Sequence, residues 1–461
     1  MSAAVPERIL RELGRTEGGP EALALLVRDQ HTRRLVLLRA LLDAADSAPA
    51  TAGREPAARI RDHWALLEAA EREDRDAVRG LLLYPLTGPW AERCLHGLTA
   101  PGPVQRPDVD LAHFGALAAA AAVRAGLPFT AELPPREGTL ALPLLGALSV
   151  PGPEPVETAF DGETLTFGGR AGRRVTVRRA ADGSARSADP RWRSVVPLPA
   201  VLPGAVPVPL DDLHPYRTDG GGPERHGFSF GAALGDGDRK AWEESWSGIG
   251  PLLRIGGEHR TAEAAALLRC LVPLAPPPGS GPDGEGASHC SGTRREAFGA
   301  VLSSKPSTPA YFAATLVHEL QHTKLSALCA LVPLHHEDAA PRHFAPWRPD
   351  PRPFDGLLQG AYSHIALADY WQRFALGADH GAHRDLAWAE HARCREQVGA
   401  VLPVLAASGA LTREGRTVVN EMIALYDHLA DRPPPSGHAA RAAAYVDTAR
   451  VIWCQRNGTQ R

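Results

Sequence analysis

The sequence is poor in lysine, methionine and aromatic residues, and its charges nearly cancel. Only three of its 50 basic residues are lysines, methionine occurs twice, and Phe, Trp and Tyr make up 6% of the 461 residues. A net charge of −3 excludes the strongly basic surface of proteins that coat nucleic acids or anionic membranes. We therefore expect no nucleic-acid partner and no membrane association.

The sequence also lacks a CxxC pair and an apolar run long enough to span a bilayer. Its six cysteines stand singly, a spacing typical of reduced thiols rather than of a disulfide framework. The longest stretch without a charged residue, 194–210, has 17 residues and contains five prolines. The first residues, MSAAVPERILRELGR, are charged and lack the apolar core of a signal peptide. These features predict a soluble, cytoplasmic protein.

Changes in residue periodicity predict three regions along the chain. Residues 1–130 carry apolar side chains at helical spacing. Residues 131–220 contain short alternating runs, such as 164–167 and 174–177, between Gly, Pro and Asp turns, as is typical of short strands. Residues 221–461 return to a helical pattern. We expect an α+β fold that is mostly helical, with a β-rich segment in the middle and a helical, metal-binding C-terminal domain.

Within the C-terminal region, two helical stretches are separated by a predicted loop. The helical pattern covers residues 239–275 and resumes at Thr308. Between them, Pro276–Ser291 is rich in Gly, Ser and Pro, which favour turns over regular structure.

One motif carries recognisable chemistry: residues 318–322 read His-Glu-Leu-Gln-His, an HExxH sequence. A random arrangement of this composition would contain about 0.05 such matches. On a helix, His318 and His322 lie one turn apart on the same face, the spacing that two imidazoles need to share one cation. The alternative is that both are hydrogen-bonded core histidines. Burying two imidazoles among apolar residues without compensation, however, costs free energy. The motif therefore predicts a metal site.

The residues around the motif predict a single buried helix. Thr308 can cap its start, with Pro309 at the first helical position. Residues 310–332 contain no Gly or Pro, and Pro333 ends the pattern. Because apolar residues surround the motif on most sides, we expect the helix to be buried.

HExxH usually marks a zinc peptidase in which the Glu, here Glu319, is the general base acting on a metal-bound water. The longer metzincin motif is absent, because Leu325 stands in place of its Gly and Leu328 in place of its third His. A third metal ligand must therefore come from elsewhere in the chain.

The best candidate for the third ligand is His364, on a second predicted helix that Asp355 can cap and Gly377 can end. Gly360 and Ala368 lie one turn either side of it, which leaves room for another helix to approach. A lone His on an apolar helix is also commonly a hydrogen-bonded core residue. The alternatives that remain open are Asp369, Glu390, His391 and Glu421.

The loop between these two helices, residues 335–354, is rich in His, Pro and Arg. If His364 reaches the metal, the chain ties this loop to the site at both ends. Arg348 and Arg352 are then placed to present a guanidinium to a small-molecule carboxylate. A solvated surface loop is the alternative.

Three segments together resemble a known family: FGAVLSSKP, YFAATLVHELQHTKLSALCALVPL and PWRPDPRPFDGLLQGAYSHIALADYW. Over about residues 288–371 the chain is similar to the HExxH-motif peptide-modification proteins of actinobacteria. Those domains occur alone or fused to radical SAM maturases, in gene clusters for ribosomally made, post-translationally modified peptides. HExxH alone is weak support, whereas HELQH followed by GLLQGxYxH is much more specific. The resemblance implies a non-haem Fe(II) oxygenase, a 2-oxoglutarate-dependent peptide β-hydroxylase.

Carried onto this chain, the resemblance implies His318, His322 and His364 as iron ligands. Three protein ligands leave three positions on an octahedral iron, two for 2-oxoglutarate and one for O₂. An all-His set differs from the usual two-His-one-carboxylate triad. In this interpretation Glu319 need not be a general base; it is able to orient a ligand or to coordinate iron itself.

The resemblance also favours the loop 347–353 as part of the active site. It implies that an arginine there binds 2-oxoglutarate, with Arg352 as the first choice and Arg348 as the second. The substrate it implies is a ribosomal precursor peptide.

Two other functions fit the same residues. One is a zinc peptidase that cleaves such a peptide, with Glu319 as base. The other is a metal-stabilised binding protein that presents the peptide to another enzyme. The arginine-bearing loop separates the two enzymes, because only an oxoglutarate enzyme needs a dedicated dicarboxylate site.

Overall fold

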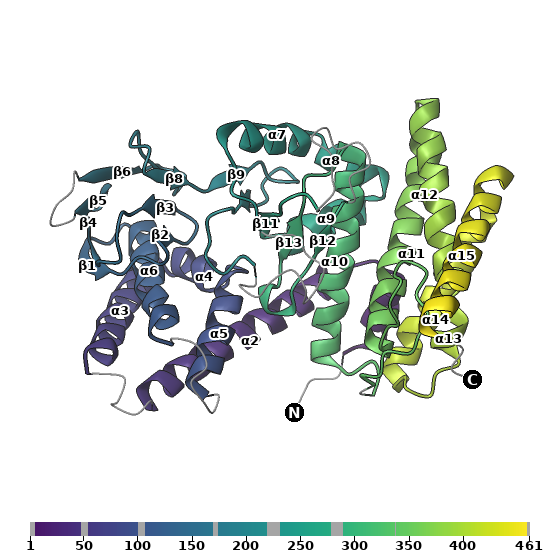
Figure 1. Cartoon of the computed structure of the whole chain (residues 1–461), viewed down its shortest axis with the longest axis horizontal. Helices are drawn as coiled ribbons and strands as arrows, with labels where there is room; N and C mark the ends of the chain where they lie inside the picture. The colour runs from purple at the N-terminus through teal and green to yellow at the C-terminus, as the bar shows by residue number, and fades with distance from the viewer. Residues whose placement is uncertain are drawn as a thin grey trace.

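The computed structural model describes residues 5–47, 54–99, 107–168, 174–218, 231–277, 289–336 and 338–458, and its fold is α+β and mostly helical (Figure 1). The helical character predicted for the N-terminal region is confirmed. The helices are α1 (Glu7–Gly14), α2 (Pro20–Ser47), α3 (Arg54–Glu73), α4 (Arg75–Leu82), α5 (Thr87–Thr99) and α6 (Pro107–Ala125). A run of alanines on α6 packs into the core against α3, α4 and α5 and against the strands β1 (Phe129–Leu133) and β2 (Thr139–Leu142).

A β-rich segment follows, as the alternating residues predicted. It contains a sheet of order β1-β4-β5-β6-β7 and a smaller one of order β2-β3-β8, both antiparallel. In β5 and β6, Leu165, Phe167, Val175 and Val177 are buried while the residues between them are more exposed. The strands are β1 (Phe129–Leu133), β2 (Thr139–Leu142), β3 (Gly146–Ser149), β4 (Val156–Phe160), β5 (Thr164–Gly168), β6 (Val175–Arg179), β7 (Ala185–Arg186) and β8 (Trp192–Ser194).

A third sheet joins the middle of the chain to its C-terminal region. Its order is β12-β13-β11-β10-β9; β10, β11 and β13 run parallel to one another, and the edge strands β9 and β12 pair antiparallel. Because it contains strands from both sides of residue 220, the sheet crosses the boundary expected there. Its strands are β9 (Val196–Leu198), β10 (Val208–Leu210), β11 (Cys270–Pro273), β12 (Ser291–Gly292) and β13 (Ala300–Ser303).

Strand β11 corrects the helical prediction for residues 239–275. Helices α7 (Asp236–Ser247), α8 (Ile249–Ile255) and α9 (Glu258–Leu267) do fill most of that stretch. Two residues after α9, however, Cys270–Pro273 form a strand whose side chains are all buried. A short run that is apolar on both faces has no alternation, so its periodicity does not distinguish a strand from a buried helix.

Six helices complete the described chain. Helix α10 carries the HExxH motif and packs against α11, which packs against α12; α12 also packs against α15 at the edge of the molecule (Figure 1). The predicted ends of α10 are confirmed: the Thr308 hydroxyl accepts the Tyr311 N–H, and the helix stops before Pro333. The helices are α10 (Pro309–Leu331), α11 (Phe354–Gly377), α12 (Gly381–Gly399), α13 (Leu402–Ala406), α14 (Arg413–His428) and α15 (Ser436–Asn457).

The predicted cap of α11 is wrong, although the helix does end at Gly377. Pro353 occupies the cap position and makes no side-chain cap, and Asp355 lies inside the first turn. The Asp355 carboxylate instead accepts hydrogen bonds from Arg295 at 2.6 Å and His335 at 3.2 Å. The carboxylate that the sequence predicted as a helix cap therefore binds tertiary partners instead.

Two further sequence predictions concern the loop 276–291 and the membrane. Residues 278–288 of that loop lie outside the described residues, and 276–277 and 289–290 are neither helix nor strand. Across the residues that the structure describes, none of the helices has the length and apolar character required to cross a bilayer.

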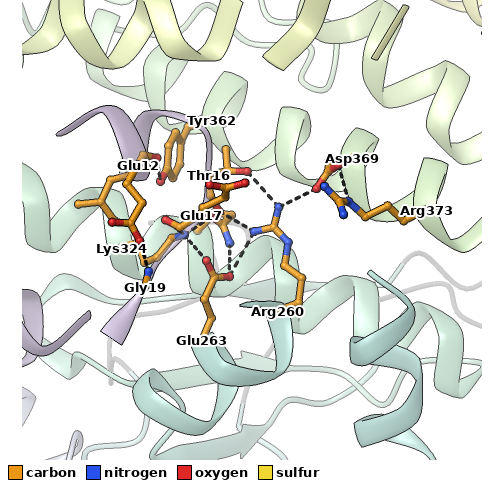
Figure 2. Close-up of polar contacts among 12 residues, drawn as sticks. Glu12, Thr16, Glu17, Gly19, Arg260, Glu263, Lys324, Tyr362, Asp369 and Arg373 are labelled. Atoms are coloured by element: carbon orange, nitrogen blue, oxygen red, sulfur yellow. Dashed lines mark hydrogen bonds and ion pairs between the residues drawn. The ribbon is translucent and has the colours of Figure 1, made fainter. Parts of the chain in front are cut away.

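A buried network of ion pairs holds the segment after α1 against α9, α10 and α11 (Figure 2). Lys324 of α10 donates to the carboxylate of Glu263 and to the carbonyl of Thr16. Arg260 donates to Glu263, to that same carbonyl and to Asp369. The network therefore fixes the helix with the HExxH motif to three other segments.

Candidate metal centre

The two histidines of the HExxH motif face one another on α10. The Nε2 atoms of His318 and His322 lie 3.1 Å apart. When two nitrogens bind one metal in adjacent positions, each at about 2.0–2.1 Å, they lie about 3 Å from one another. The observed separation therefore fits a shared cation. Burial lowers the pKa of both imidazoles, helped in His318 by the neighbouring histidines. Both rings are therefore neutral, the form in which histidine binds a metal.

His364 joins this pair from α11. Its ring centroid lies 5.2 Å from that of His318. Its Nδ1 donates to the carbonyl of Gly360 at 2.8 Å, which leaves Nε2 as the nitrogen with a free lone pair. Burial lowers the pKa of His364 to about 3. The structure thus brings the three predicted histidines together from two helices.

A hydrogen-bond relay sets the tautomer of His322. The amide nitrogen of Gln359 donates to the Ser326 hydroxyl at 3.3 Å, so its oxygen is the atom that accepts from Nδ1 of His322 at 3.2 Å. The lone pair of His322 is then on Nε2, facing His318. Metal-binding histidines commonly donate through their other nitrogen in this way, which fixes the ring and raises its basicity.

Glu319 places a buried carboxylate beside the histidines. The Ser291 hydroxyl donates to its Oε1 at 2.7 Å, and its buried Oε2 has no hydrogen-bond partner. Burial raises the pKa of Glu319 to about 7, against the opposite effect of Ser291. Oε1 lies 4.0 Å from Nε2 of His318. An unpartnered buried carboxylate oxygen is costly, and a nearby cation would offset that cost.

These groups have the donor chemistry of a first-row metal site. Neutral imidazoles and a carboxylate are ligands that both Fe(II) and Zn(II) accept. Within the described ranges, no group of three or more His, Cys, Asp or Glu side chains is already arranged as a complete ligand set. The site therefore consists of a preformed pair, His318 and His322, with His364 next to it.

The indole of Trp347 covers His364. The two rings stack with their centroids 4.4 Å apart and their planes at 21°. Gly360 makes this possible, because a Cβ there would lie 2.3 Å from Cζ2 of the indole. The space beside Gly360 was expected to admit another helix, so that expectation is wrong: a loop side chain fills it. The stack restrains the imidazole and shields it from water.

Gly360→Ala should loosen His364 by displacing Trp347. Overpacking of this kind typically costs about 1–3 kcal/mol, so we expect a lower free energy of unfolding and weaker binding of divalent metal. Denaturant titration and metal titration measure the two effects. Gly381→Ala at the start of α12 is the control, because its Cβ would meet no atom within 4 Å. Equal stability and equal metal affinity in the two variants would contradict this assignment.

The two loop arginines line the same cavity as the histidines. Nε of Arg348 donates to Asp350 at 3.0 Å, and Nη1 of Arg352 reaches the same carboxylate at 3.4 Å. Arg352 packs over Gly356, where a Cβ would lie 2.9 Å from its Nε. That Nε is buried without a hydrogen-bond partner. Burial lowers the pKa of His322, and the charge of Arg352 lowers it further. Arg352 is therefore the loop arginine whose charge acts on the motif.

The other candidates for the third ligand have different partners. Asp369 belongs to the buried network, and Glu421 pairs with an arginine that follows α1. His391 contacts a backbone carbonyl of α11, and Glu390 pairs with Arg393. Of the described side chains that line the cavity with the histidines, none belongs to these four candidates.

Three residues of the site were not predicted: Ser291, Gln359 and Arg393. Gln359 lies within the GLLQGxYxH motif, so the sequence contained a signal for its position beside the histidines. Arg393 of α12 lines the cavity, and its charge contributes to lowering the pKa of His318 and His364. It and Ser291 are common residue types far from the motif, and only tertiary packing brings them to it.

The cavity has a volume of about 1090 Å³. Its walls come from α2, α5, α10, α11, α12, the loop 347–352 and the segment between β12 and β13. Pockets for small ligands commonly span about 300–1,000 Å³, so this one has room for more than a metabolite.

In comparisons with known proteins, no protein-family model matches the chain, and no curated protein matches it significantly. The family resemblance of residues 288–371 therefore stays an expectation, and the functional argument depends on the site.

Proposed function

We propose that the protein is an Fe(II)- and 2-oxoglutarate-dependent oxygenase that hydroxylates the β-carbon of a residue in a ribosomally made precursor peptide. One observation carries the proposal: neutral histidines and the two loop arginines line a single cavity. A zinc peptidase needs the metal but no guanidinium for a dicarboxylate, whereas this class of oxygenase needs both. The resemblance of residues 288–371 favours the same chemistry.

In the proposed reaction His318, His322 and His364 hold the metal. When bound, an Fe(II) ion would supply O₂ activation and coordination positions for the 2-oxo acid of 2-oxoglutarate. Gln359 and the carbonyl of Gly360 keep two of the imidazoles in the tautomer that a metal needs.

The remaining roles in this proposal concern the co-substrate and water. Arg352 binds the distal carboxylate of 2-oxoglutarate, with Arg348 as the second choice. Trp347 excludes water from one face of the cluster. Glu319, held by Ser291, orients or completes the ligand set.

The alternative proposal is a zinc metallopeptidase with Glu319 as general base. The observation that favours it is the place of that carboxylate, with one unpartnered oxygen and the other 4.0 Å from Nε2 of His318. A carboxylate so placed is able to take a proton from a metal-bound water.

One experiment separates the two proposals. Anaerobically purified protein is mixed with Fe(II), 2-oxoglutarate and a candidate precursor peptide, and air is then admitted. The oxygenase adds one oxygen atom to the peptide and forms succinate. Zinc-dependent cleavage of the peptide without consumption of 2-oxoglutarate would establish the peptidase instead.

Arg352→Ala should raise the apparent Michaelis constant for 2-oxoglutarate at least about tenfold. Removing one partner of a hydrogen-bonded charge pair costs on the order of 2–5 kcal/mol. Succinate formation in the presence of peptide measures the effect. Arg348→Ala tests the second choice, because this side chain is 46% exposed against 29% for Arg352 and shares its carboxylate partner. An unchanged 2-oxoglutarate dependence in both variants would place the carboxylate anchor elsewhere, with Arg393 next to be tested.

A cytoplasmic location belongs to the same proposal. All six cysteines are free thiols in the structure, as is usual in a reducing compartment. Oxygenases with Fe(II) also depend on a compartment that keeps the metal reduced.

A further inference from the structure

Arginine dominates the wall of the metal cavity. Seven arginines line it, five of them outside the loop: Arg33, Arg34, Arg294, Arg295 and Arg393. Against them, the described residues of the wall include four acidic side chains: Glu92, Glu296, Glu319 and Asp355. The cavity is therefore cationic.

The ion pairs at the wall leave cationic charge uncompensated. Of the described arginines at the wall, four have one carboxylate each: Arg33 pairs with Asp29, Arg294 with Glu296, Arg295 with Asp355 and Arg393 with Glu390. The two loop arginines, by contrast, share the single carboxylate of Asp350. Guanidiniums that share one carboxylate keep donors available for a ligand.

Arg34 on α2 is the clearest case of a cation without its own carboxylate. It is only 8% exposed, and it donates to the backbone carbonyls of Tyr84 at 2.9 Å and Glu296 at 2.7 Å. Within the described ranges it forms no ion pair. Gly88 leaves space for the guanidinium, since a Cβ there would lie 2.3 Å from Nη2. Burial lowers the pKa of Arg34 to about 10, and the charges of Glu92 and Glu296 oppose this only in part. A bound anion would offset the remaining cost of burying the charge.

One molecule of 2-oxoglutarate does not account for this wall. Its distal carboxylate needs one guanidinium, and its other carboxylate belongs to the metal chelate. Arg33, Arg34 and Arg294 come from α2 and from the segment between β12 and β13, not from the loop assigned to the co-substrate. The volume of about 1090 Å³ leaves room for a second, larger anion.

We propose that this second anion is the substrate itself, an acidic peptide. Its Asp or Glu side chains bind the arginines of α2 and of residues 294–295, while the residue to be modified reaches the histidines. The inference depends on the proposed function for its peptide, and it adds the chemical class of that peptide.

The test is the binding of labelled peptides to the full-length protein, with no metal or co-substrate added. The probes are a Gly-Ser-Glu repeat peptide and the same peptide with Gln or Lys in place of Glu, followed by fluorescence anisotropy. The Glu peptide should bind at least about tenfold more tightly than the Gln peptide, and the Lys peptide more weakly still. The preference should shrink as the salt rises from about 50 mM to about 300 mM.

Point variants assign the binding to this wall. Arg33→Gln and Arg294→Gln should each weaken the Glu peptide about three- to fivefold. Arg254→Gln on α8 is the matched control for Arg33. Each side chain pairs with an acidic residue four positions away, and their exposures are 50% and 51%. The control should leave binding unchanged.

The outcomes separate this inference from the proposed function. Equal affinity for the Glu, Gln and Lys peptides, or equal losses in Arg33→Gln and Arg254→Gln, would overturn the acidic-peptide inference. Hydroxylation of a neutral peptide with formation of succinate would then support the oxygenase proposal without the acidic-peptide inference. Zinc-dependent cleavage of a tightly bound Glu peptide would reject the oxygenase and support the acidic substrate.

Discussion

His364→Ala is expected to abolish metal-dependent turnover while the helices stay intact. The imidazole is one of three neutral nitrogen donors in the cluster, and its Nδ1 is already committed to the carbonyl of Gly360. Loss of a partner that merely orients a ligand costs about 10- to 100-fold in metal affinity, so loss of a ligand should cost at least about 100-fold. We expect iron content and succinate formation to fall together, with unchanged far-ultraviolet circular dichroism.

His391→Ala is the matched control for this substitution. His391 is fully buried, and its Nδ1 contacts the carbonyl of Ala368 at 2.8 Å, the same contact and distance that His364 makes with Gly360. Both substitutions therefore remove a buried imidazole and one hydrogen bond to backbone. His391→Ala should lower stability by a similar amount and leave metal binding unchanged. Loss of metal in His391→Ala, with retention in His364→Ala, would reverse the ligand assignment and leave the oxygenase proposal open.

Helix α10 was predicted to within a residue because its limits are encoded locally. Thr308 and Pro309 mark its start and Pro333 its end, and each acts through the backbone of its own neighbours. The relation of His318 to His322 follows from helical spacing alone. Both ends of this helix depend on residues close in sequence, and there the prediction and the structure agree.

Features that depend on tertiary partners were the ones predicted wrongly or not at all. The Asp355 carboxylate has the right spacing for a cap but binds Arg295 and His335. Trp347 fills the space beside Gly360 that was expected to hold a helix. In each case the residue was singled out correctly and the partner was not, because the partner comes from a segment that no local pattern connects to it.

Lys324→Met should lower the free energy of unfolding by about 3–5 kcal/mol, the cost of removing one partner of a buried ion pair. The side chains of Lys324 and Glu263 are each 1% exposed. Burial lowers the pKa of Lys324 to about 8, against the opposing effect of Glu263. Burial would also raise the pKa of Glu263, but Lys324 and Arg260 together hold it below its usual value. Without the ammonium, Glu263 keeps the guanidinium of Arg260 and the amide of Gln321.

The same substitution removes the contacts of α10 with the segment after α1. The ammonium of Lys324 donates to the carbonyls of Thr16 and Glu17, two acceptors that Met does not satisfy (Figure 2). We therefore expect the residues around Thr16 to become sensitive to limited proteolysis. Lys324→Arg should not rescue the protein, because a planar guanidinium is larger than an ammonium and differs from it in donor geometry. That requirement explains why a chain with three lysines among 50 basic residues keeps one of them here.

Lys240→Met is the control, because the same chemical change there affects an exposed pair. Lys240 is 77% exposed and lies 3.8 Å from Glu244, one turn along α7. Exposed pairs of this kind contribute about 0.3–0.5 kcal/mol, so the control should unfold close to the wild-type denaturant midpoint. If Lys324→Met matched that control in stability and in protease resistance, the network would not anchor α10. The position of His318 and His322 would then depend on apolar packing alone.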